Sequence, residues 1–221
     1  SAENSTEDSA ALVVGVDVAD LRDRLQRAQP AMVELLERLV VTESPTARPA
    51  AVRQVQSLLE AELRSAGLRV RRVPGRESAG VLVATPSNRR RGRPFQMLVG
   101  HCDTVWPLGT LQAMPLRREG DRLHGPGVFD MKAGLVQMLF ALRTLKTMGL
   151  TPPADCVVVI DSDEEQGSRD AARTIRRLAR RAARAYVLEP AFGPAGRLKT
   201  SRKGVGGFQI QVTGKAAHAG I

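Results

Sequence analysis

The chain of 221 residues is long enough for one large domain or one and a half, and its 43% hydrophobic residues suffice for a folded core. Aromatic residues make up only 3%, so that core must consist mainly of alanine, valine and leucine. The net charge of +10 suggests an anionic partner, but no zinc finger, aromatic-rich RNA-binding motif or lysine-rich tail accompanies it, so we expect no nucleic-acid partner.

Residues 1–18 open on a polar stretch without the apolar core of a signal peptide, and we expect a flexible N-terminus there. No later run is long enough to span a bilayer, so we expect no membrane partner. Cys102 and Cys156 form no CxxC pair and lie in apolar runs, which indicates two buried thiols. We therefore expect a cytoplasmic protein, or a periplasmic one if an export signal was removed.

The first half of the chain predicts helices followed by strands. Helical periodicity from 19 to 42 is interrupted at Pro30, which indicates two short helices or a kink. Residues 48–66 place their apolar side chains on one helical face, and Gly67 ends that helix. Strands are expected next, at 68–73, 79–85 and 95–100.

The second half alternates helices with strands. A helix is expected from about residue 131 to Gly149, and the apolar run 156–160 predicts a strand buried on both faces. A helix from Arg169 to about Arg184 then precedes the strand at 185–190. This order predicts an α/β fold over residues 19–204, with a mainly parallel sheet sandwiched by helices.

The last stretch has a different pattern. Residues 203–216 alternate with period two between glycine-rich edges, which predicts an exposed-face strand. We expect residues 205–221 to begin a smaller α+β lid or dimerisation domain.

The predicted helix at 169–184 has an apolar face opposite a face of six arginines. That arginine face is either an anionic or nucleic-acid binding patch or an ordinary solvated surface. No base-stacking aromatic residues lie nearby, which favours the solvated surface.

Polar groups suited to metal binding follow several of the predicted strands. His101 and Asp103 come directly after the strand at 95–100, two residues apart, so both side chains point to the same side of the sheet. A carboxylate that holds one histidine nitrogen fixes the tautomer with which the other nitrogen binds a metal. Asp130 follows a Gly-Pro-Gly turn, where it either caps the next helix or bridges two cations.

Three glutamates complete this set. Glu164 and Glu165 follow the buried strand, and Glu189 ends the last strand of the predicted sheet. Open α/β sheets gather ligand-binding groups at such strand ends. One histidine and several carboxylates at one sheet edge predict a zinc site with nitrogen and oxygen ligands.

Five segments, HCDTV, GPGVFDMKAG, DEEQGS, LEP and GKAAHAG, occur in this order from about residue 90 to the last residue. Their order and spacing resemble the co-catalytic zinc exopeptidase and deacylase family. That family includes glutamate carboxypeptidase, acetylornithine deacetylase, succinyl-diaminopimelate desuccinylase and aminoacylase, and the chain most resembles the glutamate carboxypeptidase branch. The resemblance implies a zinc-peptidase-like catalytic domain and a small peptide or N-acyl-amino-acid substrate. It also implies a homodimer formed through the lid.

The resemblance implies a set of metal ligands for two zinc ions, which cobalt or manganese could replace. His101 and Glu189 would bind one zinc, Asp130 would bridge both, and Glu165 would bind the second. The family's second zinc takes a further histidine from near the C-terminus. The chain has three histidines, none of them in a matching place, and we treat His124 as structural. We therefore expect an N-terminal portion of a longer protein, inactive or nearly so by itself.

The resemblance also implies residues that carry the chemistry. Glu164 would be the general acid/base for amide hydrolysis by metal-activated water, and Asp103 would orient His101. His218 would stabilise the oxyanion, often in the active site of the neighbouring subunit. Arg202 and Lys203 either contact an anionic group of the substrate or are ordinary basic surface residues.

Two other functions stay open from the sequence. The chain could be a catalytically silent relative that acts as a binding protein, or an anion binder that works through its arginine-rich helix. Within the enzyme class, an N-acyl-amino-acid deacetylase is the alternative to a carboxypeptidase.

Overall fold

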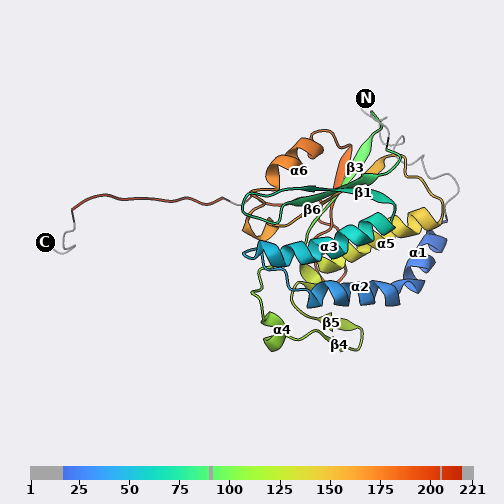
Figure 1. Ribbon diagram of the computed structural model, residues 1–221, viewed down its shortest axis with the longest axis horizontal. Coiled ribbons are helices and arrows are strands. Elements are labelled where there is room, and N and C mark those ends of the chain that lie inside the picture. The colour runs from blue at the N-terminus through green and yellow to red at the C-terminus, as the bar shows by residue number, and fades with distance from the viewer. Residues whose placement is uncertain (1–16, 90–91, 205, 216–221) are drawn as a thin grey trace, which may run out of the picture. The chain divides into compact units, whose positions relative to one another are not determined.

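The computed structural model describes residues 17–89, 92–204 and 206–215 (Figure 1). The chain divides into two units, residues 1–190 and 191–221, and all the named helices and strands belong to the first. The assignments of residues 19–204 to a catalytic domain and of residues 205–221 to a lid stay predictions. In the described ranges, no helix is both long and apolar enough to cross a membrane.

Three helices open the chain: α1 (Val18–Arg27), α2 (Gln29–Val41) and α3 (Pro49–Ser65). Prolines occupy the first turns of α2 and α3, where the fixed φ of proline suits a helix start and its missing N–H leaves no hydrogen bond unmade. The predicted interruption at Pro30 is therefore confirmed as a boundary between two helices.

Five strands form the main sheet, in the order β1-β2-β6-β3-β7. They are β1 (Leu68–Val73), β2 (Val81–Pro86), β3 (Phe95–His101), β6 (Asp155–Asp161) and β7 (Arg184–Val187). β3 pairs parallel with β6 and with β7, whereas β2 pairs antiparallel with β1 and with β6. The α/β fold is confirmed, but the sheet is mixed rather than mainly parallel. The connection at 74–80 is too short for the crossover that a parallel β1-β2 pair would need.

Helices cover both faces of this sheet (Figure 1). On one face, α2, α3 and α5 (Ala133–Thr147) contribute leucines such as Leu39, Leu59 and Leu139 to a core with β1, β2 and β6. On the other face, α6 (Ala172–Ala179) packs Ile175 against a second core. β6 is buried along its whole length because it serves both cores.

α6 ends at Ala179, five residues before the predicted limit, because the chain must turn to enter β7 at Arg184. Its apolar side packs on the sheet as predicted, and all six arginines are exposed. They are Arg173, Arg176, Arg177, Arg180, Arg181 and Arg184. The solvated-surface interpretation of this helix agrees with that exposure.

The segment between β3 and α5 contains elements that the sequence did not predict. A short helix, α4 (Thr110–Ala113), precedes a two-stranded hairpin of β4 (Arg117–Glu119) and β5 (Arg122–His124). A wide turn, η1 (Val128–Lys132), then leads into α5. These pieces have too few residues for a hydrophobic period to be visible in the sequence.

Described residues 203–204 and 206–215 carry no assigned strand, so the strand predicted from the period-two pattern is not formed here. A strand is held by hydrogen bonds to a neighbouring strand, and the alternating pattern does not supply that neighbour.

Candidate metal centre

The carboxyl ends of three neighbouring parallel strands meet at one edge of the sheet. His101 is the last residue of β3, and it lies opposite Asp161, the last residue of β6. Glu189 follows two residues after the end of β7. The short 3-10 helix η2 (Glu164–Gln166) begins three residues after β6 and carries Glu164 and Glu165. The strand register therefore brings four of the predicted site residues to one place.

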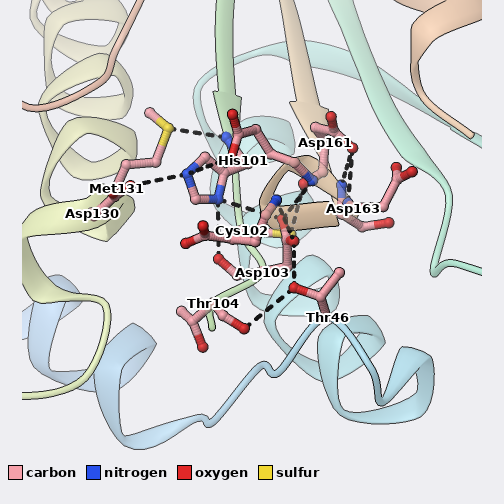
Figure 2. A network of polar contacts seen from close by, with 12 residues as sticks. Thr46, His101, Cys102, Asp103, Thr104, Asp130, Met131, Asp161 and Asp163 are labelled. Carbon is pink, nitrogen blue, oxygen red and sulfur yellow. Dashed lines mark hydrogen bonds and ion pairs between the residues drawn. The ribbon is translucent and has the colours of Figure 1, made fainter. Parts of the chain in front are cut away.

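His101 stands at the centre of the cluster, and its side chain is 1% exposed. Its Nε2 lies 3.1 Å from Asp130 Oδ1, 3.4 Å from Glu189 Oε1 and 3.9 Å from Glu164 Oε2. Its Nδ1 faces Asp103, 3.0 Å from the backbone oxygen and 3.4 Å from Oδ1 (Figure 2). One ring nitrogen is thus held by Asp103, and the other points at a group of carboxylates.

Asp103 is itself held in place by several donors. Thr46 Oγ1 donates to Asp103 Oδ2 at 2.7 Å (Figure 2). The backbone N–H groups of Glu164 and Glu165 approach the same carboxylate at 3.4 and 3.3 Å. Burial alone would raise the pKa of Asp103, but the hydrogen bonds from His101 and Thr46 hold it below its ordinary value. Asp103 is therefore a buried group that contacts both the His101 ring and the loop after β6.

Asp130 is positioned by an unusual stretch of backbone. It lies inside η1 with φ −112° and ψ 102°, and its peptide bond to Met131 is cis. The N-cap of α5 is Lys132, so the interpretation of Asp130 as a helix cap is wrong. The carboxylate instead turns toward His101 Nε2 (Figure 2). The next residue, Met131, is buried, and its Sδ accepts the backbone N–H of His101 at 3.1 Å.

Among the described residues, two groups of three side chains offer ligand atoms within 4.8 Å of one another. One consists of His101, Asp130 and Glu165, and the other of His101, Glu164 and Glu189. Both groups share His101, so five side chains converge. A set of one imidazole and four carboxylates suits a divalent cation such as zinc.

The electrostatics of the cluster favour a cation. Burial alone would lower the pKa of His101, but its hydrogen bonds to Asp103 and Glu189 raise that pKa to about 11. Burial raises the pKa of Glu164 and of Glu165, and the neighbouring carboxylates raise both further, against the opposing effect of His101. Like charges are thus crowded at this point, and a divalent ion would relieve their repulsion. The residues present therefore fit a metal.

The geometry leaves one predicted distinction open. The sequence assigns Glu165 to the metal and Glu164 to proton transfer, whereas the structure brings an oxygen of each glutamate within reach of a metal group. Which of the two is the ligand stays a prediction. Arg202 and Lys203 are exposed in the second unit, and their substrate role also stays a prediction. His218 lies outside the described residues.

The sequence did not identify the residues that support the loop after β6. Asp161 and Asp163 are both buried. Asp161 accepts the backbone N–H of Ser162 and Asp163 and the hydroxyl of Ser168, and Asp163 accepts the N–H of Asp170. Burial and the neighbouring Asp163 raise the pKa of Asp161 to about 7. The serines of this loop were the available signal, because short polar side chains favour such local hydrogen bonds.

Two further supporting residues were also missed, Thr46 and the fully buried Lys132. Burial lowers the pKa of Lys132 to about 8. Nothing in the residue type distinguishes these two from the surface threonines and lysines of the chain. Their role depends on contacts with residues far away in the sequence.

Comparisons with known proteins find similarity over most of the chain. Residues 97–212 match the model of the peptidase family M20/M25/M40. Carboxypeptidase G2 from Pseudomonas sp. (strain RS-16) is 34% identical over 220 residues, which cover 96% of this chain and 52% of that protein. Succinyl-diaminopimelate desuccinylase from Xylella fastidiosa (strain M12) is 29% identical over 140 residues, which cover 58% of this chain and 37% of that one.

A solved structure, human carnosine dipeptidase 1, superimposes with a TM-score of 0.68 at 16% identity and covers 79% of this chain and 41% of its own. At that identity the likeness concerns the fold alone. The chain thus spans about half the length of carboxypeptidase G2, and less of the other two proteins.

Proposed function

Because the chain belongs to the peptidase family M20/M25/M40, we propose that the whole protein is a zinc-dependent amidohydrolase of the glutamate carboxypeptidase type. Its substrate would be a small peptide or an N-acyl-amino acid, cleaved at the amide bond. The 34% identity to carboxypeptidase G2 over almost the whole chain supports this choice. The single observation that carries the proposal is the convergence of two potential ligand groups on the buried His101.

The metal would be held by the side chains around His101. His101 and Glu189 would bind one ion, Asp130 would lie between two ions, and Glu165 would bind the second. Zinc, when bound there, supplies a Lewis acid that acidifies water and polarises the scissile carbonyl. A further ligand for the second ion would come from outside the described residues.

Glu164 is proposed as the general acid/base. Its side chain is 47% exposed, so water and substrate can reach the carboxylate, whereas the His101 ring beside it is buried. Burial and the surrounding carboxylates raise its pKa, which brings it closer to neutral pH, where a proton carrier works best. Glu164 would accept the proton of the attacking water and deliver it to the amine that leaves.

Asp103 and His218 would support this chemistry in different ways. Asp103 accepts from Nδ1–H of His101 and so keeps Nε2 free to bind a metal. His218 would donate a hydrogen bond to the oxygen that becomes negative in the transition state. Arg202 and Lys203 would attract the carboxylate of the substrate, and a homodimer would bring one subunit's His218 to the other's centre.

The proposal is tested by metal analysis and by substitution of Glu164 in the whole protein. We expect about two zinc ions per chain. Glu164→Ala should keep metal bound and lose about 10²- to 10⁴-fold of the turnover of an N-acyl-glutamate. Glu119→Gln serves as the control, because Glu119 pairs with Arg117 on the β4-β5 hairpin and is absent from both ligand groups. Retained activity in Glu164→Ala removes its proton-transfer role, and a parent protein without metal after reconstitution rejects the metal site.

Deacylation of an N-acyl-amino acid is the second candidate function. The 29% identity to a succinyl-diaminopimelate desuccinylase favours it. Parallel assays on a small peptide that ends in glutamate and on N-succinyl and N-acetyl amino acids distinguish the two, because the better substrate has the larger kcat/KM.

A further inference from the structure

Lys132 is buried to an extent that is rare for lysine. It is 1% exposed and is the largest of the fully buried side chains. Lysine is seldom buried without a carboxylate partner, because its charge is costly to remove from water. Within the described residues, no carboxylate lies at ion-pair distance from its ammonium group. The ammonium instead donates to two backbone oxygens, Leu39 O at 2.8 Å and Thr42 O at 3.0 Å.

Both acceptors belong to the end of α2. Leu39 lies in the last turn of this helix, and Thr42 is its C-cap residue. The last carbonyls of a helix have no partner within the helix and form the negative end of its dipole. A buried ammonium is therefore well matched to this position, where it supplies donors and an opposite charge to the same group of oxygens.

The other end of Lys132 closes the turn that carries Asp130. Its backbone N–H donates to Gly127 O at 3.0 Å, and its Cε would lie 3.5 Å from a Cβ placed on Gly127. The stem of the side chain therefore runs beneath the turn 127–132. Asp130 itself is 57% exposed, and in the described part of the chain the only hydrogen bond of its carboxylate is to His101. Asp130 is thus positioned mainly through its backbone.

The segment that follows α2 also contacts the residues around His101. Thr46 N donates to Thr104 O, Thr104 N donates to Ser44 O, and the Thr46 hydroxyl donates to Asp103. Lys132 is therefore connected to His101 by two routes: through Asp130, and through α2, Thr46 and Asp103.

We propose that Lys132 is a positioning residue that locks the Asp130 turn onto the C-terminal end of α2 and thereby sets the distance between Asp130 and His101. This inference rests on the proposed metal-dependent function, which it extends beyond the ligands. Lys132 is absent from both ligand groups. It fixes the position of the Asp130 carboxylate relative to His101. Through α2 and Thr46 it also fixes the position of Asp103, which contacts the His101 ring.

The test compares Lys132→Met and Lys132→Arg with the parent whole protein. Methionine keeps a long apolar stem and removes the donors, whereas arginine keeps the charge and the donors. Leu35→Val, a small loss of packing one turn earlier in α2, serves as a control for general destabilisation. Titration with Co²⁺ reports affinity, and the visible absorption of the bound Co²⁺ reports the coordination geometry. Hydrogen exchange of the Lys132 and Thr46 amides is measured without metal.

In Lys132→Met we expect a 10- to 100-fold loss of Co²⁺ affinity, a changed Co²⁺ spectrum and faster exchange of both amides, because supporting residues have effects of that size. Lys132→Arg should recover part of each, and Leu35→Val should leave the spectrum unchanged. The proposal is overturned if Lys132→Met has the same amide exchange rates and the same Co²⁺ affinity as Leu35→Val. It is also overturned if amide exchange accelerates in Lys132→Met while the spectrum of the bound Co²⁺ stays that of the parent. A parent that binds no Co²⁺ refutes the proposed function instead, and the exchange rates then still decide whether Lys132 holds the turn.

Discussion

Replacing Gly134 with alanine tests whether the start of α5 sets the position of Glu189. Gly134 is buried in the first turn of α5, and an added Cβ would lie 1.9 Å from the backbone oxygen of Leu188. Real Cβ contacts are essentially never shorter than 3.0 Å, so the two segments must separate by about 1.1 Å. Leu188 cannot retreat freely, because its N–H donates to Val99 O in β3 at 2.9 Å. The displacement therefore passes to Glu189, the next residue.

One stabilising and two destabilising terms determine the change in stability. Helix propensity alone favours alanine over glycine by about 1 kcal/mol. Forcing extra volume into a packed site costs about 1–3 kcal/mol, and weakening the bond from Leu188 to Val99 adds about 1 kcal/mol. We therefore expect Gly134→Ala to lower the free energy of unfolding by about 1–3 kcal/mol. A shift of about 1 Å in Glu189 should also reduce turnover by on the order of 100-fold.

Urea unfolding measures the change in stability, and a turnover assay on the whole protein measures the effect of the Glu189 shift. Gln137→Ala is the matched control, because Gln137 is exposed on the same helix and alanine there meets no backbone. The reasoning is refuted if Gly134→Ala is as stable as the parent and has the same turnover rate. That result would mean that the segment after β7 moves freely and that α5 does not position Glu189.

Three further predictions concern the groups around the site. Thr46→Val should lower the free energy of unfolding by about 1–2 kcal/mol, because Asp103 loses a buried hydrogen bond of 2.7 Å, and unchanged urea unfolding would contradict this. Burial alone would raise the pKa of Asp170, but hydrogen bonds from three backbone N–H groups and the Ser78 hydroxyl lower it. The ionised carboxylate therefore stabilises the fold fully above its ordinary pKa of 3.8. That stabilisation is lost as the pH falls through the lowered pKa. Asp170→Ala should therefore have a free energy of unfolding about 1–2 kcal/mol below that of the parent at neutral pH. Urea unfolding at several pH values should show this difference between parent and variant shrinking below about pH 4. A difference that does not change with pH would rule out the ionised carboxylate as its cause. Zinc at 100 times its dissociation constant should add about 2.7 kcal/mol to the free energy of unfolding. The melting temperature should rise accordingly, and a chelator should reverse the rise. An unchanged melting temperature would argue against a zinc site in the native state.

Much of the architecture could be predicted because its signals are local. Proline and glycine mark the start of α2 and the end of α3, and the apolar run before Asp161 predicts a buried strand that β6 confirms. The motif resemblance is confirmed by the family match over residues 97–212. These predictions hold because periodicity and turn chemistry act over a few residues, so they can be seen in the sequence itself.

Pairing between distant segments could not be predicted in the same way. The antiparallel placement of β2 beside β6 joins segments more than 70 residues apart, and the period of an apolar run does not state the direction of its neighbour. The length of α6 was overestimated because its arginine-rich periodicity continues past Ala179, where the tertiary structure requires a turn into β7.

The sequence by itself determined the strands of the main sheet, the long helices around it, their order along the chain, and the position of His101 and the acidic residues after strands or turns. Only the tertiary structure decided which carboxylates stand beside which nitrogen of His101, that Asp161 and Asp163 are buried supports, and that Lys132 is enclosed beneath the Asp130 turn. The physical reason is that a residue's protonation, burial and hydrogen bonds depend on neighbours brought together by folding. A residue type at a spacing indicates what chemistry is available, and the folded contacts determine where it acts.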